Sequence, residues 1–395
     1  MKHLVLIAAV IFLLPFRLLI TAEKPEKVYS IVKQVKPFVW YETQAILWKE
    51  ILDREPGNAD AWLNFYTANR MARLVGFKEW NGSKKAYFME LDSIVEKMKR
   101  AIPGTFEYYY ILGYNNGNWD EDDVGAIKKA YEIDPSRPET YDDLIGFHEV
   151  AGDKTQMEAM CRKMFESNEI SEGVYNWNYN VLMSLDKNAV VITNGDNDTY
   201  PVWVLQMAKN IRPDVRLLNI SLLTMEKYRD KVFKELDLKP FRLDTSKLLK
   251  ETDYFISTGS QIISHLVENS AKRPVYFSMT LNPEFYKNYK NDIYMVGLAF
   301  KFSKEKFDNI ALMRNNFENN FMLDYLKETF TEDISKSVAI QLNMNYIPLF
   351  LKLYEHYNMS GEKSKAEKLK AIITKIASEN GKDGDVKSWL ENNKD

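Results

Sequence analysis

The sequence predicts a mixed fold in which helical repeats come first, a small α/β domain follows, and a helical segment closes the chain. Three observations predict this order. A spacing of proline, aromatic and apolar residues recurs between residues 56 and 144. Short β-branched runs then alternate with helical apolar spacing over residues 189–302. From residue 317 onward the apolar spacing is helical again.

Composition excludes several classes of protein. The 395 residues are 45% apolar and 28% charged, which excludes a disordered chain and a protein with many membrane spans. The net charge is −3 and no long basic stripe is present, so a nucleic-acid partner is not expected. At about 150 residues per domain, the length suits two or three domains.

The N-terminus has the pattern of a secretory signal. Lys2 and His3 precede an apolar run over residues 4–14, and a polar stretch begins at residue 21. We expect residues 1–22 to be a signal peptide, cleaved after Ala22, and the protein to be exported to the periplasm. The alternative is an uncleaved N-terminal segment that anchors the protein to the membrane, facing the periplasm, and this would be its only membrane contact. The single cysteine, Cys161, excludes an intramolecular disulfide.

The recurring spacing in the first half places an aromatic residue six positions after a proline and an apolar residue three further on. The three copies are Pro56, Trp62 and Phe65; Pro103, Tyr109 and Leu112; and Pro135, Tyr141 and Leu144. This pattern resembles tetratricopeptide repeats, whose period is about 34 residues. It predicts a helical, tetratricopeptide-like domain over residues 23–180 that offers a concave surface to a protein partner. The alternative is an ordinary helical domain whose prolines recur by chance.

The middle of the chain predicts a small Rossmann-like α/β domain over residues 186–303. Strands are expected at residues 189–193, 215–223, 274–279 and 294–302. Helices are expected at residues 200–211, 225–236 and 259–270. The first strand, helix and second strand form a β-α-β unit, so we expect parallel strands at the centre of the sheet.

The last part of the chain, residues 304–395, is expected to be helical. Residues 346–357 and 362–378 have helical apolar spacing and are separated by Met359, Ser360 and Gly361. This pattern predicts a helical hairpin. A charged and poorly ordered tail is expected after it.

The candidate site follows the first predicted strand, where ligands bind in open α/β sheets. Its residues are Asn194, Gly195, Asp196, Asn197, Asp198 and Thr199. Asp196 and Asp198 can ligate Ca²⁺, Mg²⁺ or Mn²⁺, or the segment can accept the hydroxyls of a glycan. The structural alternative is that Asp198 or Thr199 caps the next helix. The chain has no phosphate-binding glycine loop, nucleophile elbow or zinc-protease motif, and we assign no catalytic residue.

Five blocks in order resemble a known family. They are NGDNDTYPVWVLQ (194–206), RPDVRLLNISLL (212–223), KRPVYFSMT (272–280), GLAFKF (297–302) and GEKSKAEKL (361–369). Residues 188–375 resemble the soluble C-terminal region of bacterial membrane proteins similar to protein O-mannosyltransferases, of the glycosyltransferase family 117 type. The resemblance implies that residues 195–199 match a signature segment of that family.

This resemblance implies a link to envelope glycan or glycoprotein metabolism. Those relatives carry their presumed sugar-transfer chemistry in many membrane helices, whereas this chain has at most one apolar segment. We therefore expect an interaction or scaffold protein rather than an enzyme. One alternative is an enzyme that transfers or hydrolyses glycans with Asp196 and Asp198, and another is a purely structural envelope component.

Overall fold

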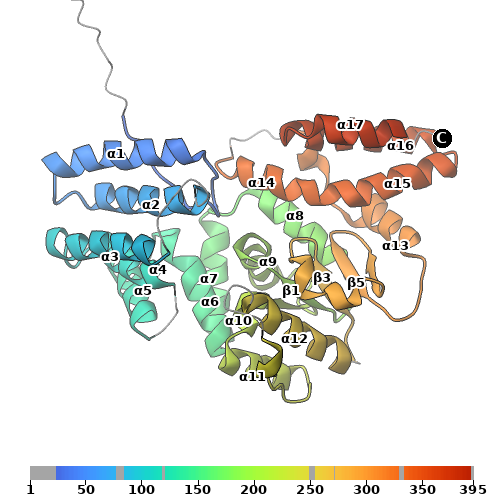
Figure 1. Cartoon of the computed structure of the whole chain (residues 1–395), viewed down its shortest axis with the longest axis horizontal. Coiled ribbons are helices and arrows are strands. Elements are labelled where there is room, and N and C mark those ends of the chain that lie inside the picture. The colour runs from blue at the N-terminus through green and yellow to red at the C-terminus, as the bar shows by residue number, and fades with distance from the viewer. Residues whose placement is uncertain are drawn as a thin grey trace, which may run out of the picture.

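The computed structural model describes residues 24–76, 84–117, 121–248, 254–270, 272–328 and 333–392. The predicted signal peptide, residues 1–22, lies outside the described residues. The described chain is mostly helical and contains a small mixed sheet of five strands (Figure 1). None of its described helices is both long and apolar enough to cross a bilayer.

The first half of the chain is built from consecutive helices that pack on one another. An extended N-terminal strap, residues 24–36, precedes them. The helices are α1 (Phe38–Arg54), α2 (Ala59–Val75), α3 (Lys84–Ala101), α4 (Phe106–Asn116), α5 (Glu121–Ile133), the short 3₁₀ helix η1 (Pro138–Thr140), α6 (Tyr141–Ala151), α7 (Lys154–Glu166) and α8 (Glu172–Met183). Figure 1 shows α1 to α7 to the left of the sheet. The predicted helical character of this half is confirmed, while its assignment to tetratricopeptide repeats stays a prediction.

The same kind of hydrogen bond occurs within two copies of the recurring spacing. The Trp62 Nε1–H donates to the carbonyl of Pro56 at 2.8 Å, and the Tyr141 hydroxyl donates to the carbonyl of Pro135 at 2.9 Å. Both rings are buried. A separation of six residues therefore lets a buried polar ring satisfy its donor on the turn before its own helix. In the remaining copy Tyr109 is only half-buried.

The sheet has the strand order β2-β1-β3-β5-β4. Its strands are β1 (Val190–Thr193), β2 (Arg216–Asn219), β3 (Val275–Ser278), β4 (Ile293–Met295) and β5 (Ala299–Phe302). The first three in spatial order are parallel, and β5 and β4 continue the sheet as antiparallel strands. All four residues of β1 are buried, as expected for a strand covered on both faces. The predicted parallel centre is thus confirmed.

Helices cover both faces of the sheet. They are α9 (Tyr200–Lys209), α10 (Ile220–Leu223), α11 (Glu226–Glu235) and α12 (Tyr254–Asn269). On one face, α9 places Trp203 in a core with Val191 of β1. The same core contains Met160 of α7, so the helical half and the sheet share it. On the other face, Phe233 and Ile262 of α11 and α12 pack near Val190.

Two strand predictions were too long. The run over 215–223 stops being a strand at Asn219, whose side chain accepts from the backbone N–H groups of Ser221 and Leu222 and so begins α10. The run over 294–302 is two antiparallel strands, because the chain reverses at Gly297 and the Val296 N–H donates to the carbonyl of Ala299.

The C-terminal helices are α13 (Asn309–Asn315), α14 (Lys336–Asn343), α15 (Ile347–Met359), α16 (Lys363–Glu379) and α17 (Asp383–Asn392). The hairpin of α15 and α16 is confirmed, and Gly361 adopts a positive φ of 77° between them. The expected tail is wrong for residues 383–392. They form α17, because Val386 and Leu390 bury their side chains in the core of α15 and α16.

Candidate functional site

The predicted loop follows β1 at the carboxyl ends of the parallel strands. In the sheet, β1 lies between β2 and β3. The hydroxyl of Thr199 links the loop to two strands by hydrogen bonds. It lies 2.8 Å from that of Thr193, at the end of β1, and accepts from the Asn219 amide at 3.0 Å. All three side chains are buried.

Asp198 folds back on its own loop. One carboxylate oxygen accepts from the Gly195 N–H at 2.8 Å, and the other accepts from the Asn194 N–H at 2.9 Å and from the hydroxyl of Thr280. Burial raises the pKa of Asp198, and these three hydrogen bonds oppose the rise by stabilising the ionised form. Both oxygens are therefore used inside the protein. Asp198 closes the turn before α9 and is not the N-cap of that helix.

Asn197 joins the loop to the helical half. Its side-chain amide donates to the carbonyl of Val32 in the N-terminal strap at 3.0 Å. Its own carbonyl accepts from the Asn178 amide of α8 at 2.8 Å. The loop is thus hydrogen-bonded both to the N-terminal strap and to α8. Asn194 has an exposed side chain, and a Cβ added to Gly195 would contact nothing within 4 Å.

Asp196 lines a cavity, and among the described residues its carboxylate has no hydrogen-bond partner. The cavity has a volume of about 520 Å³ and lies between the helical half and the sheet. Its walls come from the N-terminal strap, α2, α4, η1, the start of α6, the link from α7 to α8 and the start of α9. The exposed surface of Asp196 faces this cavity. Although this surface is exposed in the cavity, burial of the carboxylate among its neighbours and the nearby charge of Asp198 raise the pKa of Asp196.

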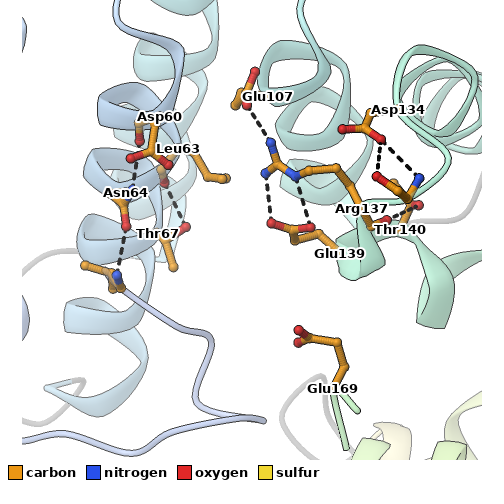
Figure 2. Close-up of polar contacts among 12 residues, drawn as sticks. Asp60, Leu63, Asn64, Thr67, Glu107, Asp134, Arg137, Glu139, Thr140 and Glu169 are labelled. Atoms are coloured by element: carbon orange, nitrogen blue, oxygen red, sulfur yellow. Dashed lines mark hydrogen bonds and ion pairs between the residues drawn. The ribbon is translucent and has the colours of Figure 1, made fainter. Parts of the chain in front are cut away.

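Two walls of the cavity face each other across it. Figure 2 shows Asp60, Asn64 and Thr67 of α2 on one side and Arg137 with Glu139 on the other, with Glu169 below. The Arg137 guanidinium bridges Glu107 at 2.7 Å and Glu139 at 2.8 Å. Arg137 is therefore committed to its own wall.

The sequence analysis missed a second pair of carboxylates, Asp142 and Asp143 in the first turn of α6. Asp142 lines the cavity, and Asp143 lies beside it in the chain. Burial and the charge of Asp196 raise the pKa of Asp142 to about 7. Burial, Asp142 and Asp196 raise the pKa of Asp143, opposed by the positive charge of Arg70. Asp142 and Asp196 thus share the cavity, and both act on the neighbouring Asp143.

Tyrosines complete the lining. Tyr110 and Tyr114 of α4 stack with ring centroids 5.6 Å apart and planes 10° from parallel. Tyr200 opens α9 beside Asp196 and also lines the cavity. Burial and the nearby carboxylates raise the pKa of both Tyr110 and Tyr200 well above the ordinary value. Their hydroxyls therefore stay protonated and can donate hydrogen bonds.

Asp196 and Asp198, the predicted metal ligands, use their carboxylates differently. Asp198 is occupied by backbone and Thr280 donors, whereas Asp196 faces the cavity. Within the described part of the chain, no three His, Cys, Asp or Glu side chains are grouped so that they can hold a metal ion. The metal site therefore stays a prediction.

A second cavity, of about 460 Å³, lies near the other end of α9. Its charged groups are largely used within the protein. Arg216 pairs with Glu149 at 2.6 Å, and Asp214 accepts from Arg212 at 3.0 Å. Lys231 donates to two backbone carbonyls at the end of α6. The first cavity is the better candidate because two of its carboxylates, those of Asp142 and Asp196, form no ion pair with any described residue.

Comparison with known proteins gives one match. Residues 174–238 match the family model named TMEM260-associated domain 2. The matched segment runs from α8 to just beyond α11 and includes the loop with Asp196. No curated protein was found to match the chain in sequence.

Replacement of Asp142 by Asn is expected to stabilise the protein at high pH. An acid with a raised folded pKa stabilises the fold only while protonated, so this contribution is lost as pH rises from about 4 toward 7. At pH 8 the variant should gain about 1–3 kcal/mol, less than the full shift implies because the side chain faces water in the cavity. At pH 4 the two proteins should be nearly equal. Urea unfolding at both pH values measures this.

Asp324→Asn is the matched control. Its side chain is 98% exposed and pairs with Lys327, which is also exposed, so we expect a change within about 0.5 kcal/mol at either pH. A loss of stability in Asp142→Asn at pH 8 would show that Asp142 is stabilised as an anion, contrary to this account.

Proposed function

We propose that this chain is an exported binding protein that holds a saccharide in the cavity between its helical half and its sheet. The observation that carries the proposal is the pairing of Asp142 and Asp196, without cationic partners, with the tyrosines of the same cavity. Carboxylates accept hydrogen bonds from sugar hydroxyls, and the hydroxyls of Tyr110 and Tyr200, which line the same cavity, can donate to sugar oxygens. The volume of about 520 Å³ lies within the range of small-ligand sites.

The family match supports a role in glycan metabolism. The matched segment contributes Asp196, Asn197 and Tyr200 to the cavity. TMEM260, for which the family is named, is an O-mannosyltransferase-like protein. Export to the periplasm rests on the sequence pattern of residues 1–22, and a role for the repeat helices in binding a protein partner rests on their resemblance to tetratricopeptide repeats. In this proposal the helical half presents the partner surface and the cavity receives the glycan.

A second candidate function is hydrolysis of a glycosidic bond. Two carboxylates flank the sugar in most enzymes of this kind, and one of them must stay protonated near neutral pH to act as the acid. The pKa of Asp142, raised to about 7, suits that role, and Asp196 is the carboxylate that would act with it. Release of reducing ends from the saccharides named below would favour this candidate over binding alone.

Calorimetric titration tests the proposal. The probes are mannobiose, N,N′-diacetylchitobiose and the glucosamine disaccharide, titrated into the purified chain. We expect saturable binding of at least one of them, weakened about tenfold or more in Asp196→Asn because a charged acceptor is lost. Asp324→Asn, remote from the cavity walls, should bind as the wild type does. Absence of binding by all three, or equal binding by Asp196→Asn, would contradict the proposal.

A further inference from the structure

The cations that line the cavity are already neutralised or turned to other groups. Arg137 pairs with Glu107 and Glu139. Lys33 of the N-terminal strap pairs with Glu169. Lys27 lies over the ring of Tyr29, 5.3 Å from its centroid. Arg137 and Lys33 therefore have acidic partners, and Lys27 contacts an aromatic ring of the strap.

Asp142 and Asp196 have no such cation. Within the described part of the chain, neither carboxylate forms an ion pair, and the Asp142 side chain accepts from the neighbouring Asp143 N–H at 3.0 Å. The charge of Asp196 raises the pKa of Asp142, and the charges of both raise the pKa of Asp143. Asp196 is exposed in the cavity and Asp142 is half-buried. Unpaired carboxylates in one cavity destabilise one another, so a positive charge placed between them would be favoured.

The tyrosine side of the cavity offers hydroxyl groups to an ammonium. Tyr110 stacks with both Tyr114 and Phe106, and the guanidinium of Arg70 lies 4.4 Å from the ring centroid of Tyr114. The ring faces of this stack are therefore in use within the protein. The hydroxyl oxygens of Tyr110 and Tyr114, which both line the cavity, can accept hydrogen bonds from an ammonium group.

From these contacts we infer that the preferred ligand is a saccharide with a free, protonated amino group, which binds with its ammonium between Asp142 and Asp196. The inference rests on the proposed function and narrows its ligand class. A divalent metal needs oxygens within about 2.0–2.6 Å of one point, whereas an ammonium accepts longer hydrogen bonds in separate directions. In the part of the chain that the structure describes, no three His, Cys, Asp or Glu side chains are grouped for a metal ion, whereas an ammonium needs only the two carboxylates.

The test compares two disaccharides that differ in the amine. The glucosamine disaccharide and N,N′-diacetylchitobiose share a backbone, but acetylation removes the positive charge. Titrated into the full chain at pH 7, the free amine should bind about tenfold tighter or more, as expected for charge-assisted hydrogen bonds. In Asp142→Asn/Asp196→Asn the two should bind within about threefold of each other, because the anionic acceptors are gone. Asp324→Asn should keep the wild-type ratio.

The outcomes separate this inference from the proposed function. If the acetylated disaccharide binds as tightly as the free amine, and binding still depends on Asp196, the inference is wrong and the saccharide proposal stands. If neither disaccharide nor mannobiose binds, both are wrong. Far-ultraviolet circular dichroism of the double variant checks its folding, and the single variant Asp196→Asn gives the same comparison if the double variant does not fold.

Discussion

Replacement of Trp62 by Ala is expected to lower the free energy of unfolding by about 3–5 kcal/mol, the range for truncating a buried tryptophan. Trp62 is 8% exposed and packs against the helices that follow α2. Its ring meets Phe65 edge to face with centroids 6.2 Å apart. Its Nε1–H also satisfies the carbonyl of Pro56 in the turn between α1 and α2. The substitution therefore leaves a cavity and removes a hydrogen bond together.

Urea unfolding followed by circular dichroism at 222 nm measures this loss. Ile46→Ala is the control, since Ile46 is 62% exposed on α1 and should change stability by less than about 0.5 kcal/mol. A similarly small change in Trp62→Ala would show that this ring does not anchor the helical half.

Replacement of Asp198 by Asn is expected to cost about 1–3 kcal/mol, the cost of leaving a buried donor without an acceptor. Both carboxylate oxygens accept from backbone N–H groups, those of Asn194 and Gly195. An Asn side chain has one oxygen, so whichever way it turns, its own amide meets one of these N–H groups. For this reason the usual equivalence of Asn and Asp in capping fails at this position.

The matched comparison is Asp196→Asn, two residues away in the same loop. Asp196 faces the cavity and its pKa is raised, so the loss of its charge should leave stability unchanged or slightly higher at pH 8. Thermal unfolding of the two variants at one pH gives the comparison. Equal losses in both would mean that Asp196 has a structural role that the contacts of the loop do not reveal.

The order of elements was predictable because each depends on local patterns. β1 is a β-branched run that ends at a polar loop, and α9 has helical apolar spacing, so both lie close to their predicted positions. The errors came from apolar runs that continue across a turn. In the second strand, Asn219 is the signal that the chain turns into a helix, and in the last strand Gly297 is the signal of a reversal. Asn219 and Gly297 are visible in the sequence, but the apolar residues around each of them favour a single continuous strand.

The sequence predicts the loop of the candidate site but not the residues that the helical half contributes to it. The loop after β1 could be found because its position follows from the topology of an α/β sheet. Asp142 and Tyr110 could not, because only the packing of the helical half against the sheet brings them to the cavity. In the sequence, Asp142 and Asp143 have the pattern of acidic residues at a helix start, where they favour the helix dipole. Their proximity to Asp196 is a tertiary effect.

The central claim is that one cavity, walled by both halves of the chain, binds a saccharide. Hydrogen exchange with mass spectrometry, with and without the glucosamine disaccharide, tests it most directly. The account predicts slower exchange at residues 27–33 of the N-terminal strap and at residues 196–201, which line the cavity from its two sides. It predicts no change at residues 363–379 of α16, which lie outside it. Protection confined to one half, or unchanged exchange with the glucosamine disaccharide and with the other two saccharides of the calorimetric titration, would contradict the claim.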